Sequence, residues 1–280
     1  MEKKLIRVAH SPDSDDAFMF YALAKDKIDT GEFRFDHVLS DIETLNQKAR
    51  QGTYEVSAIS FHAFPELCDQ YALLPSGSSM GDGYGPMVIA REPYDPKVIS
   101  EKVVAIPGLK TTAFLALKIY EPNVRFQVMP FNEILPAVAR GDVDLGLIIH
   151  EGQLTYAESG LHKILDLGIW WQEKTGGLPL PLGGNVVRKD LGEAACRKIS
   201  DILRTAIQYS LDHRQEALEY ALTFARGMDP NTADRFVGMY VNELTVDYGE
   251  RGRKALHRLF DEAVAKKLID KKPALHFVGD

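Results

Sequence analysis

The chain has 280 residues, of which 45% are hydrophobic, and a net charge of −7. This length can bury the core of one large or two medium domains. The acidic balance, without a basic stripe, disfavours binding to nucleic acid or to an anionic membrane. The chain has no apolar run of about 18 residues and no apolar core of a signal peptide near its start, so we expect a cytoplasmic protein that does not bind a membrane.

Strand-like and helix-like segments alternate in the first third of the chain. We predict strands over residues 5–9, 33–39, 54–59 and 71–74, and helices over 17–24 and 42–50. This alternation favours a sheet with helices on its faces. The segment Ser76–Pro86 is rich in glycine and serine and too long for a simple turn. It is a candidate binding loop or a crossover between lobes.

A second set of the same kind follows the strand-like residues 87–90 and the hinge-like segment Glu92–Pro96. Its predicted strands are 103–106, 124–128, 145–149 and 163–167, with helices over 111–120 and 132–140. From Glu193 onward the patterns are helical, over 194–212, 215–225, 230–240 and 249–267. We therefore predict an α/β fold with a large lobe (1–92 and 186–280), a small lobe (93–185), a helical C-terminal tail and a ligand cleft between the lobes.

Polar residues gather where predicted strands lead into helices, at residues 10–16, 57–62, 108–112 and 150–153. Ligands of open α/β sheets bind outside the carboxyl ends of the strands. His150 follows a buried, strand-like run, so its imidazole is a candidate for proton transfer. The alternative is that His150 only caps the strand through a backbone hydrogen bond.

The segment Pro107–Thr112 is a glycine loop that ends in two hydroxyl residues at a predicted helix start. Such a loop suits an anion, and a carboxylate fits better than a nucleotide because the glycine spacing of a phosphate loop is absent. Thr111 as an ordinary helix cap is an equally good interpretation. The acidic run Asp13–Asp16 matches neither a calcium loop nor a phosphatase motif well. We expect Asp15 or Asp16 to cap the first helix and one of them to reach a substrate hydroxyl.

The remaining candidates have ordinary structural interpretations beside the functional ones. His10 and His62 are secondary site candidates that suit the edge of the core, and Trp170–Trp171 could stack on a ligand or pack in the core. Cys68 and Cys196 lack metal or redox spacing, so we expect two reduced, buried thiols. No nucleophile elbow or zinc spacing occurs, and we therefore expect no metal and no cofactor.

Four segments of the chain closely resemble the 1,4-dihydroxy-6-naphthoate synthases of the futalosine pathway of menaquinone synthesis. They are Asp144–Gly152, Pro107–Ala113, Gly83–Pro86 and Leu182–Arg188. That family has the two-lobed periplasmic-binding-protein type II fold, shared with chorismate dehydratase, so the resemblance implies a mixed sheet flanked by helices in each lobe. It also implies a lyase that converts cyclic dehypoxanthinylfutalosine to 1,4-dihydroxy-6-naphthoate and dihydroxyacetone.

The resemblance further assigns roles to individual residues. His150 would be the base that starts carbon–carbon cleavage, and the substrate, a small aromatic carboxylate, would contact Ser11, Asp16, Ile59, Ser60, Phe61, Thr111 and Thr112. The family usually begins this site with Ser-Pro-Cys-Pro-Asn-Asp-Thr-Phe, whereas Ser11–Phe18 reads Ser-Pro-Asp-Ser-Asp-Asp-Ala-Phe. The extra acids Asp13 and Asp15 would weaken the binding of an anion unless they pair or face solvent.

Two other functions agree with the same residues. One is a chorismate dehydratase-like enzyme, which the His-Glu-Gly segment at residues 150–152 disfavours. The other is a non-catalytic protein that closes on an organic acid. The sequence leaves open whether the chain forms a homodimer through its helical tail.

Overall fold

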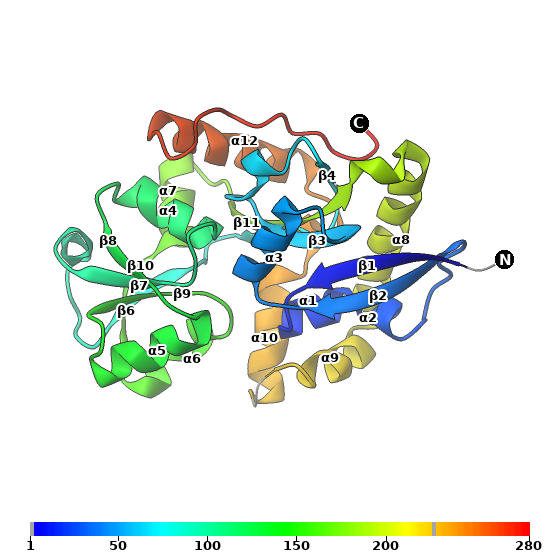
Figure 1. The fold of residues 1–280 in the computed structure, drawn as a ribbon. Helices are drawn as coiled ribbons and strands as arrows, with labels where there is room; N and C mark the ends of the chain where they lie inside the picture. Colours follow the sequence, from blue (N-terminus) through cyan, green and yellow to red (C-terminus); the bar gives the residue numbers. More distant parts are fainter. Residues whose placement is uncertain (1–2, 226–227) are drawn as a thin grey trace. The chain divides into compact units, whose positions relative to one another are not determined.

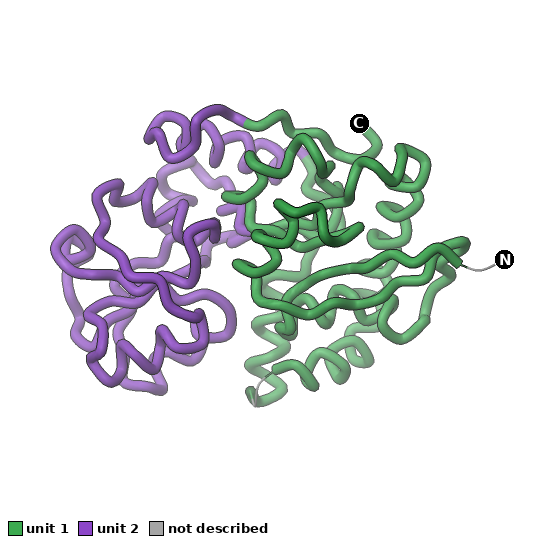
Figure 2. The backbone as a smooth tube through the Cα atoms, in the orientation of Figure 1, with its two compact units in different colours: residues 1–79, 183–249, 273–280 green, residues 80–182, 250–272 purple. Residues whose placement is uncertain are grey.

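The computed structural model describes residues 3–225 and 228–280. Residues 1–79, 183–249 and 273–280 form unit 1, and residues 80–182 and 250–272 form unit 2 (Figure 2). The chain passes between the units at 79/80, 182/183, 249/250 and 272/273. Neither unit is therefore a continuous piece of sequence.

Unit 1 is built on a six-stranded mixed sheet in the order β2-β1-β3-β11-β4, and β5 pairs with β11 (Figure 1). Strand β1 is parallel to β2 and β3, whereas β11 is antiparallel to β3 and β4. The strands are β1 (Lys4–His10), β2 (Phe33–Leu39), β3 (Val56–Ser60), β4 (Tyr71–Leu73), β5 (Ser79–Gly81) and β11 (Leu180–Arg188). Strands β5 and β11 continue into unit 2, so they connect the two units.

The helices of unit 1 bury a large apolar cluster against this sheet. They are α1 (Ser14–Met19), α2 (Tyr21–Ala24), α3 (Ile42–Arg50), α8 (Glu193–Asp212), α9 (Arg214–Leu222), α10 (Pro230–Tyr240) and α11 (Glu243–Val246), with 3-10 turns at Phe64–Glu66 and Lys189–Leu191. In α8 the buried residues Cys196, Ile199, Leu203 and Ala206 recur every three or four positions. This spacing puts one face of the helix on the core.

Unit 2 has a five-stranded mixed sheet in the order β10-β6-β9-β7-β8. Strand β7 is parallel to β8 and β9, and β6 is antiparallel to β9 and β10. The strands are β6 (Met87–Ala90), β7 (Val103–Ile106), β8 (Arg125–Val128), β9 (Leu145–Ile148) and β10 (His162–Asp166). The helices are α4 (Thr112–Tyr120), α5 (Phe131–Arg140), α6 (Gly152–Thr155), α7 (Leu167–Thr175) and α12 (Gly249–Ala265), with 3-10 turns at Pro96–Ser100 and Tyr156–Ser159.

The boundaries of the two units differ from those of the predicted lobes. Strand β6 pairs with β9 and β10, so the crossover lies at Ser79/Met80 within β5, and the segment Glu92–Pro96 lies inside unit 2. The predicted large lobe includes the residues of helix α12. This helix belongs to unit 2, where Arg251 donates hydrogen bonds to Asp82 at 2.6 and 2.7 Å. The predicted cleft remains a prediction.

Most predicted elements are confirmed within one to three residues. The predicted helix over residues 17–24 was wrong in two respects, because it begins earlier, at Ser14, and is interrupted at Phe20 between α1 and α2. The glycine- and serine-rich segment after β4 contains the short strand β5, which the sequence pattern did not indicate. In the part of the chain that the structure describes, no helix is both long and apolar enough to cross a membrane.

Candidate functional site

The loop between β1 and α1, in unit 1, is organised by its own acidic side chains. The Ser11 amide donates to Asp16 Oδ2 at 2.7 Å, and the Ser11 hydroxyl donates to Asp13 Oδ2 at 2.8 Å. The helix cap was predicted wrongly, because Asp13 is the N-cap residue of α1 and Asp15 and Asp16 lie in its first turn. Asp16 therefore orders the loop by accepting a hydrogen bond from the Ser11 amide. Asp13 is buried, at 1% exposure.

Ser60, at the end of β3, is held by Asn46 of helix α3. The Ser60 amide donates to Asn46 Oδ1 at 2.8 Å, and Asn46 Nδ2 donates to Ser60 Oγ at 3.1 Å. Both residues are buried, at 4% and 1% exposure. Since Ser60 Oγ accepts from Asn46, the Ser60 hydroxyl proton points away from Asn46. The hydroxyl is therefore oriented to donate to the oxygen of a ligand. The sequence analysis missed Asn46, whose only signal was a polar residue on the buried face of an amphipathic helix.

Phe61 and Ile59 lie beside two glycines of β11. Ile59 pairs with Gly184 and Ser60 with Gly183 in the antiparallel register. A Cβ on Gly184 would lie 2.9 Å from the Phe61 ring and 2.2 Å from the Tyr248 hydroxyl. Phe61 and Tyr248 also meet edge to face, with ring centroids 6.2 Å apart. The missing side chain at Gly184 therefore makes room for both aromatic rings.

The buried His10 forms a pair with the partly buried His37 of β2. His10 Nδ1 lies 2.9 Å from the Ser11 carbonyl oxygen, and His10 Nε2 lies 3.0 Å from His37 Nδ1. A carbonyl can only accept, so His10 carries its proton on Nδ1 and accepts at Nε2 from His37. Burial lowers the pKa of both imidazoles to about 4. His10 is therefore a neutral residue of the core edge, one of the two interpretations that the sequence left open.

In unit 2, Thr111 and Thr112 occupy the start of helix α4. Thr111 is the N-cap residue, and its hydroxyl accepts from the Phe114 amide at 3.3 Å and donates to the Gly108 carbonyl at 3.0 Å. The Thr112 hydroxyl donates to the Leu182 carbonyl at 2.5 Å. The capping interpretation of Thr111 is confirmed. The first-turn amides of such a helix still point outward and suit an anion.

His150 lies two residues beyond β9 and has a left-handed backbone, with φ of 59°. Non-glycine residues rarely adopt this conformation, and it costs on the order of 1–3 kcal/mol. The imidazole packs against Phe131, with ring centroids 4.7 Å apart, and the His150 carbonyl accepts from the Gln153 amide at 3.1 Å. The chain thus turns sharply here, and Glu151 and Gln153 are buried at 8% and 4% exposure.

The secondary candidates lie mostly in the packed interior. Trp171 is fully buried and donates to the Pro179 carbonyl at 3.0 Å, and Trp170 packs edge to face on Tyr120. The tryptophan pair is thus part of the packing of unit 2. His62 is buried at 8% exposure. Cys196 is buried as predicted, whereas the prediction for Cys68 was wrong, since this thiol is partly exposed.

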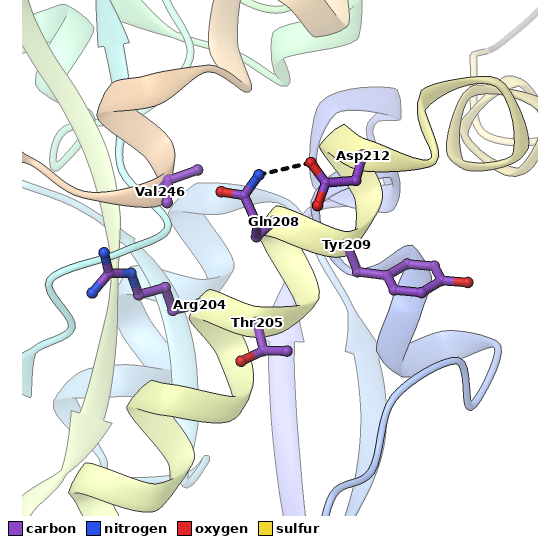
Figure 3. Close-up of a pocket in the computed structure, with 6 residues that line it drawn as sticks. All are labelled: Arg204, Thr205, Gln208, Tyr209, Asp212 and Val246. Atoms are coloured by element: carbon purple, nitrogen blue, oxygen red, sulfur yellow. Dashed lines mark hydrogen bonds between the residues drawn. The ribbon is translucent and has the colours of Figure 1, made fainter.

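An open groove of about 410 Å³ lies along α8 in unit 1 (Figure 3). Its walls contain none of the predicted site residues and consist of Arg204, Thr205, Gln208, Tyr209, Asp212 and Val246. Gln208 donates to Asp212 at 2.9 Å across the exposed face of the helix. The groove is therefore distinct from both groups of candidate residues.

The predicted site residues thus form two groups, and each group is assembled within one unit. Ser11, Asp16, Ile59, Ser60 and Phe61 belong to unit 1, and Thr111, Thr112 and His150 belong to unit 2. In each group the residues follow the carboxyl ends of parallel strands, β1 and β3 in one sheet and β7 and β9 in the other. This is the position that ligand-binding residues take in α/β sheets.

Comparisons with solved structures agree with this architecture. A crystal structure of an Archaeoglobus fulgidus protein is 46% identical, covers 95% of this chain and 98% of its own, and has a TM-score of 0.90. The alkanesulfonate-binding protein SsuA from Xanthomonas axonopodis pv. citri has a TM-score of 0.71 at 12% identity, over 99% of this chain and 97% of its own. The likeness to SsuA shows the fold alone, which is that of periplasmic binding proteins, as predicted.

Sequence comparisons identify the family. A family model described as "Menaquinone biosynthesis" matches residues 6–265. The 1,4-dihydroxy-6-naphthoate synthase of Thermus thermophilus is 39% identical, over 98% of this chain and 99% of its own length. The enzyme of the same name from Streptomyces coelicolor is 37% identical, over 98% of this chain and 97% of its own length. The chain therefore belongs to the menaquinone-biosynthesis family that includes these two synthases.

Proposed function

We propose that the chain is a 1,4-dihydroxy-6-naphthoate synthase, a carbon–carbon lyase that releases 1,4-dihydroxy-6-naphthoate and dihydroxyacetone from cyclic dehypoxanthinylfutalosine. The observation that carries this proposal is the identity of 37–39% to two enzymes of that name over nearly the full length of all three chains. Identity of this extent, without large gaps at either end, supports a shared reaction as well as a shared fold.

His150 is the proposed general base. Its imidazole stands at the carboxyl end of β9, on a backbone turn whose left-handed conformation is costly and is therefore a mark of function. A neutral imidazole there accepts the proton whose removal starts carbon–carbon cleavage. The contact with Phe131 orients the ring and keeps water from one of its faces. Activity should therefore fall when acid protonates this residue.

Helix α4 is the proposed binding site for the substrate carboxylate. Its first-turn amides and the positive end of its dipole attract an anion, while the hydroxyls of Thr111 and Thr112 are held by backbone carbonyls. These hydrogen bonds fix both hydroxyl groups at the start of the helix whose backbone amides attract the carboxylate. Thr111 and Thr112 are both 2% exposed, which strengthens electrostatic attraction by excluding water.

The residues of unit 1 supply polar contacts to the rest of the substrate. The clamp from Asn46 leaves the Ser60 hydroxyl proton free to be donated to a substrate oxygen. Phe61 follows Ser60 and is fully buried against Tyr248, so we propose that it supports the end of β3 from within the core. The Ser11 amide donates to Asp16 and the Ser11 hydroxyl donates to Asp13, so we propose that Ser11 and Asp16 shape the loop that contacts the substrate.

The test is incubation of the wild-type protein and the His150→Ala variant with cyclic dehypoxanthinylfutalosine, with products followed by mass spectrometry. We expect dihydroxynaphthoate from the wild type and a rate about 10²- to 10⁴-fold lower from the variant, because loss of a general base typically costs two to four orders of magnitude. The exposed His276→Ala variant is the matched control and should keep full activity. Substantial turnover by His150→Ala would refute the role of this residue.

A parallel incubation with chorismate separates the synthase from a dehydratase of the same fold. Consumption of chorismate, and no conversion of the futalosine derivative, would replace the proposed reaction. A binding protein would instead be indicated if the wild type and His150→Ala both bound an aromatic carboxylate saturably and neither formed any product.

A further inference from the structure

Strand β8 forms one edge of the sheet in unit 2, and all four of its residues are exposed. Phe126 is 41% exposed and Val128 is 52% exposed, which puts two of the larger exposed apolar side chains of the described chain on a single short strand. Both side chains point to the face of the sheet where Phe114 of α4 packs, since the Phe114 and Phe126 ring centroids lie 4.7 Å apart. An exposed apolar edge of this kind is a template for pairing with another strand.

The backbone of β8 also presents hydrogen-bonding groups at this edge. The Met129 amide donates to the Ile106 carbonyl of β7 at 3.1 Å, and β8 and β7 are parallel with Val128 opposite Ile106. The amide and carbonyl of one strand residue point to one side, and those of the next residue point to the other side. Arg125, Gln127 and Met129 therefore face β7, whereas the amides and carbonyls of Phe126 and Val128 point away from the sheet.

We propose that β8 is a homodimer interface, in which β8 pairs antiparallel with β8 of a second copy about a two-fold axis at Gln127. With this axis, Phe126 of each copy lies opposite Val128 of the other, and these are the residues whose backbone groups point outward. Each such pair exchanges two backbone hydrogen bonds. The register also covers each exposed Phe126 ring with a β-branched side chain, a favourable cross-strand combination.

The charges near the edge favour a second copy as the occupant. Gln127 lies opposite Ala105, which packs with Ile134 and Val138 of α5, so Arg125 and Gln127 share the α5 face of the sheet. The two-fold pairing aligns exposed Arg125 with Met129 of the other copy, which lies two residues before α5. The first turn of α5 carries the exposed acid Glu133, so each copy offers a cation and an anion to its mate. An interface that is complementary to itself suits a closed, symmetric dimer.

Sedimentation of the full chain over a wide concentration range tests the pairing. We expect a reversible monomer–dimer equilibrium, whose dissociation constant rises at least tenfold in the Val128→Lys variant, because a charge on an edge strand opposes pairing. Leu39→Lys is the matched control, since Leu39 is 45% exposed on β2, the edge strand of the other sheet. A monomer at every concentration would overturn the proposal, and so would equal weakening by both variants.

Cross-linking tests the register independently. Gln127 would lie opposite Gln127 of the second copy, in a pair that exchanges no backbone hydrogen bonds. The two Cα atoms of such a pair are about 4.5 Å apart, which is within the range that a disulfide spans. In a Cys68→Ser background, Gln127→Cys should form an oxidised dimer efficiently, whereas Arg125→Cys should not, because its Cα atoms would be several residues apart along the strands. Equal cross-linking of both variants, or of neither, would contradict the two-fold register.

Discussion

Asn46 is the residue on which the position of Ser60 depends. Truncation in Asn46→Ala leaves the buried Ser60 amide without its acceptor, and such a loss costs about 1–3 kcal/mol. We expect a loss of stability of this size in urea unfolding, together with a higher KM. The exposed Asn123→Ala variant is the control and should stay within about 0.5 kcal/mol of the wild type. A loss of stability without any change in KM would show that Ser60 does not contact the substrate.

The pair His10 and His37 predicts a specific pH dependence of stability. Burial lowers the pKa of both residues to about 4, well below the value of about 6.5 for an unfolded chain. The nearby acids Asp13 and Asp36 oppose this effect but are outweighed. Between pH 4 and pH 6.5 the unfolded state binds more protons than the folded state. The contribution of the neutral pair to the free energy of unfolding is therefore complete above pH 6.5 and is lost as the pH falls toward 4.

For His10 alone, the loss between pH 7 and pH 5 is on the order of 2 kcal/mol. Urea unfolding at several pH values measures it. The His10→Gln variant should have a flatter profile over this interval, and the exposed His276→Gln variant serves as the control. An unchanged free energy of unfolding between pH 7 and pH 5 would contradict the prediction. It would mean that the folded protein holds the pair protonated or leaves both imidazoles accessible to solvent.

Helix α4 begins with a cap that also belongs to the proposed carboxylate site. In Thr111→Ala the Phe114 amide loses its acceptor, which should cost about 1 kcal/mol of stability. Thr111→Ser keeps the hydroxyl and is the matched variant, with stability near that of the wild type. If α4 binds the substrate, Thr111→Ala should raise KM more than it lowers kcat. Equal KM values for the two variants would restrict Thr111 to its capping role.

The C-terminal segment connects both units, because α12 packs in unit 2 and residues 273–280 return to unit 1. There Phe277 is 2% exposed, and backbone hydrogen bonds of 2.9 Å join Leu73 to His276 and Val278. Deletion of residues 250–280 should therefore destabilise both units, as rapid cleavage in limited proteolysis would show. Deletion of residues 279–280 alone is the control and should leave the digestion pattern unchanged. Protection of the longer deletion would mean that the units fold without this segment.

Local patterns in the sequence determined most of the secondary structure and the local structural role of some candidate site residues. The strands and helices follow from apolar periodicity, and the cap at Thr111 follows from a hydroxyl at a helix start. The proposed catalytic and binding roles rest on a family resemblance, because spacing alone leaves His150 and Thr111 with two interpretations each.

Tertiary structure alone decided which residues meet across long stretches of chain. The bonds from Asn46 to Ser60 and from His10 to His37 join separate elements, and no local pattern encodes such contacts. The unit boundaries were also beyond the sequence, because α12 joins unit 2 through packing and the contact of Arg251 with Asp82, formed 169 residues apart. Periodicity specifies which face of an element is buried, whereas the partner of that face depends on how all the elements pack together.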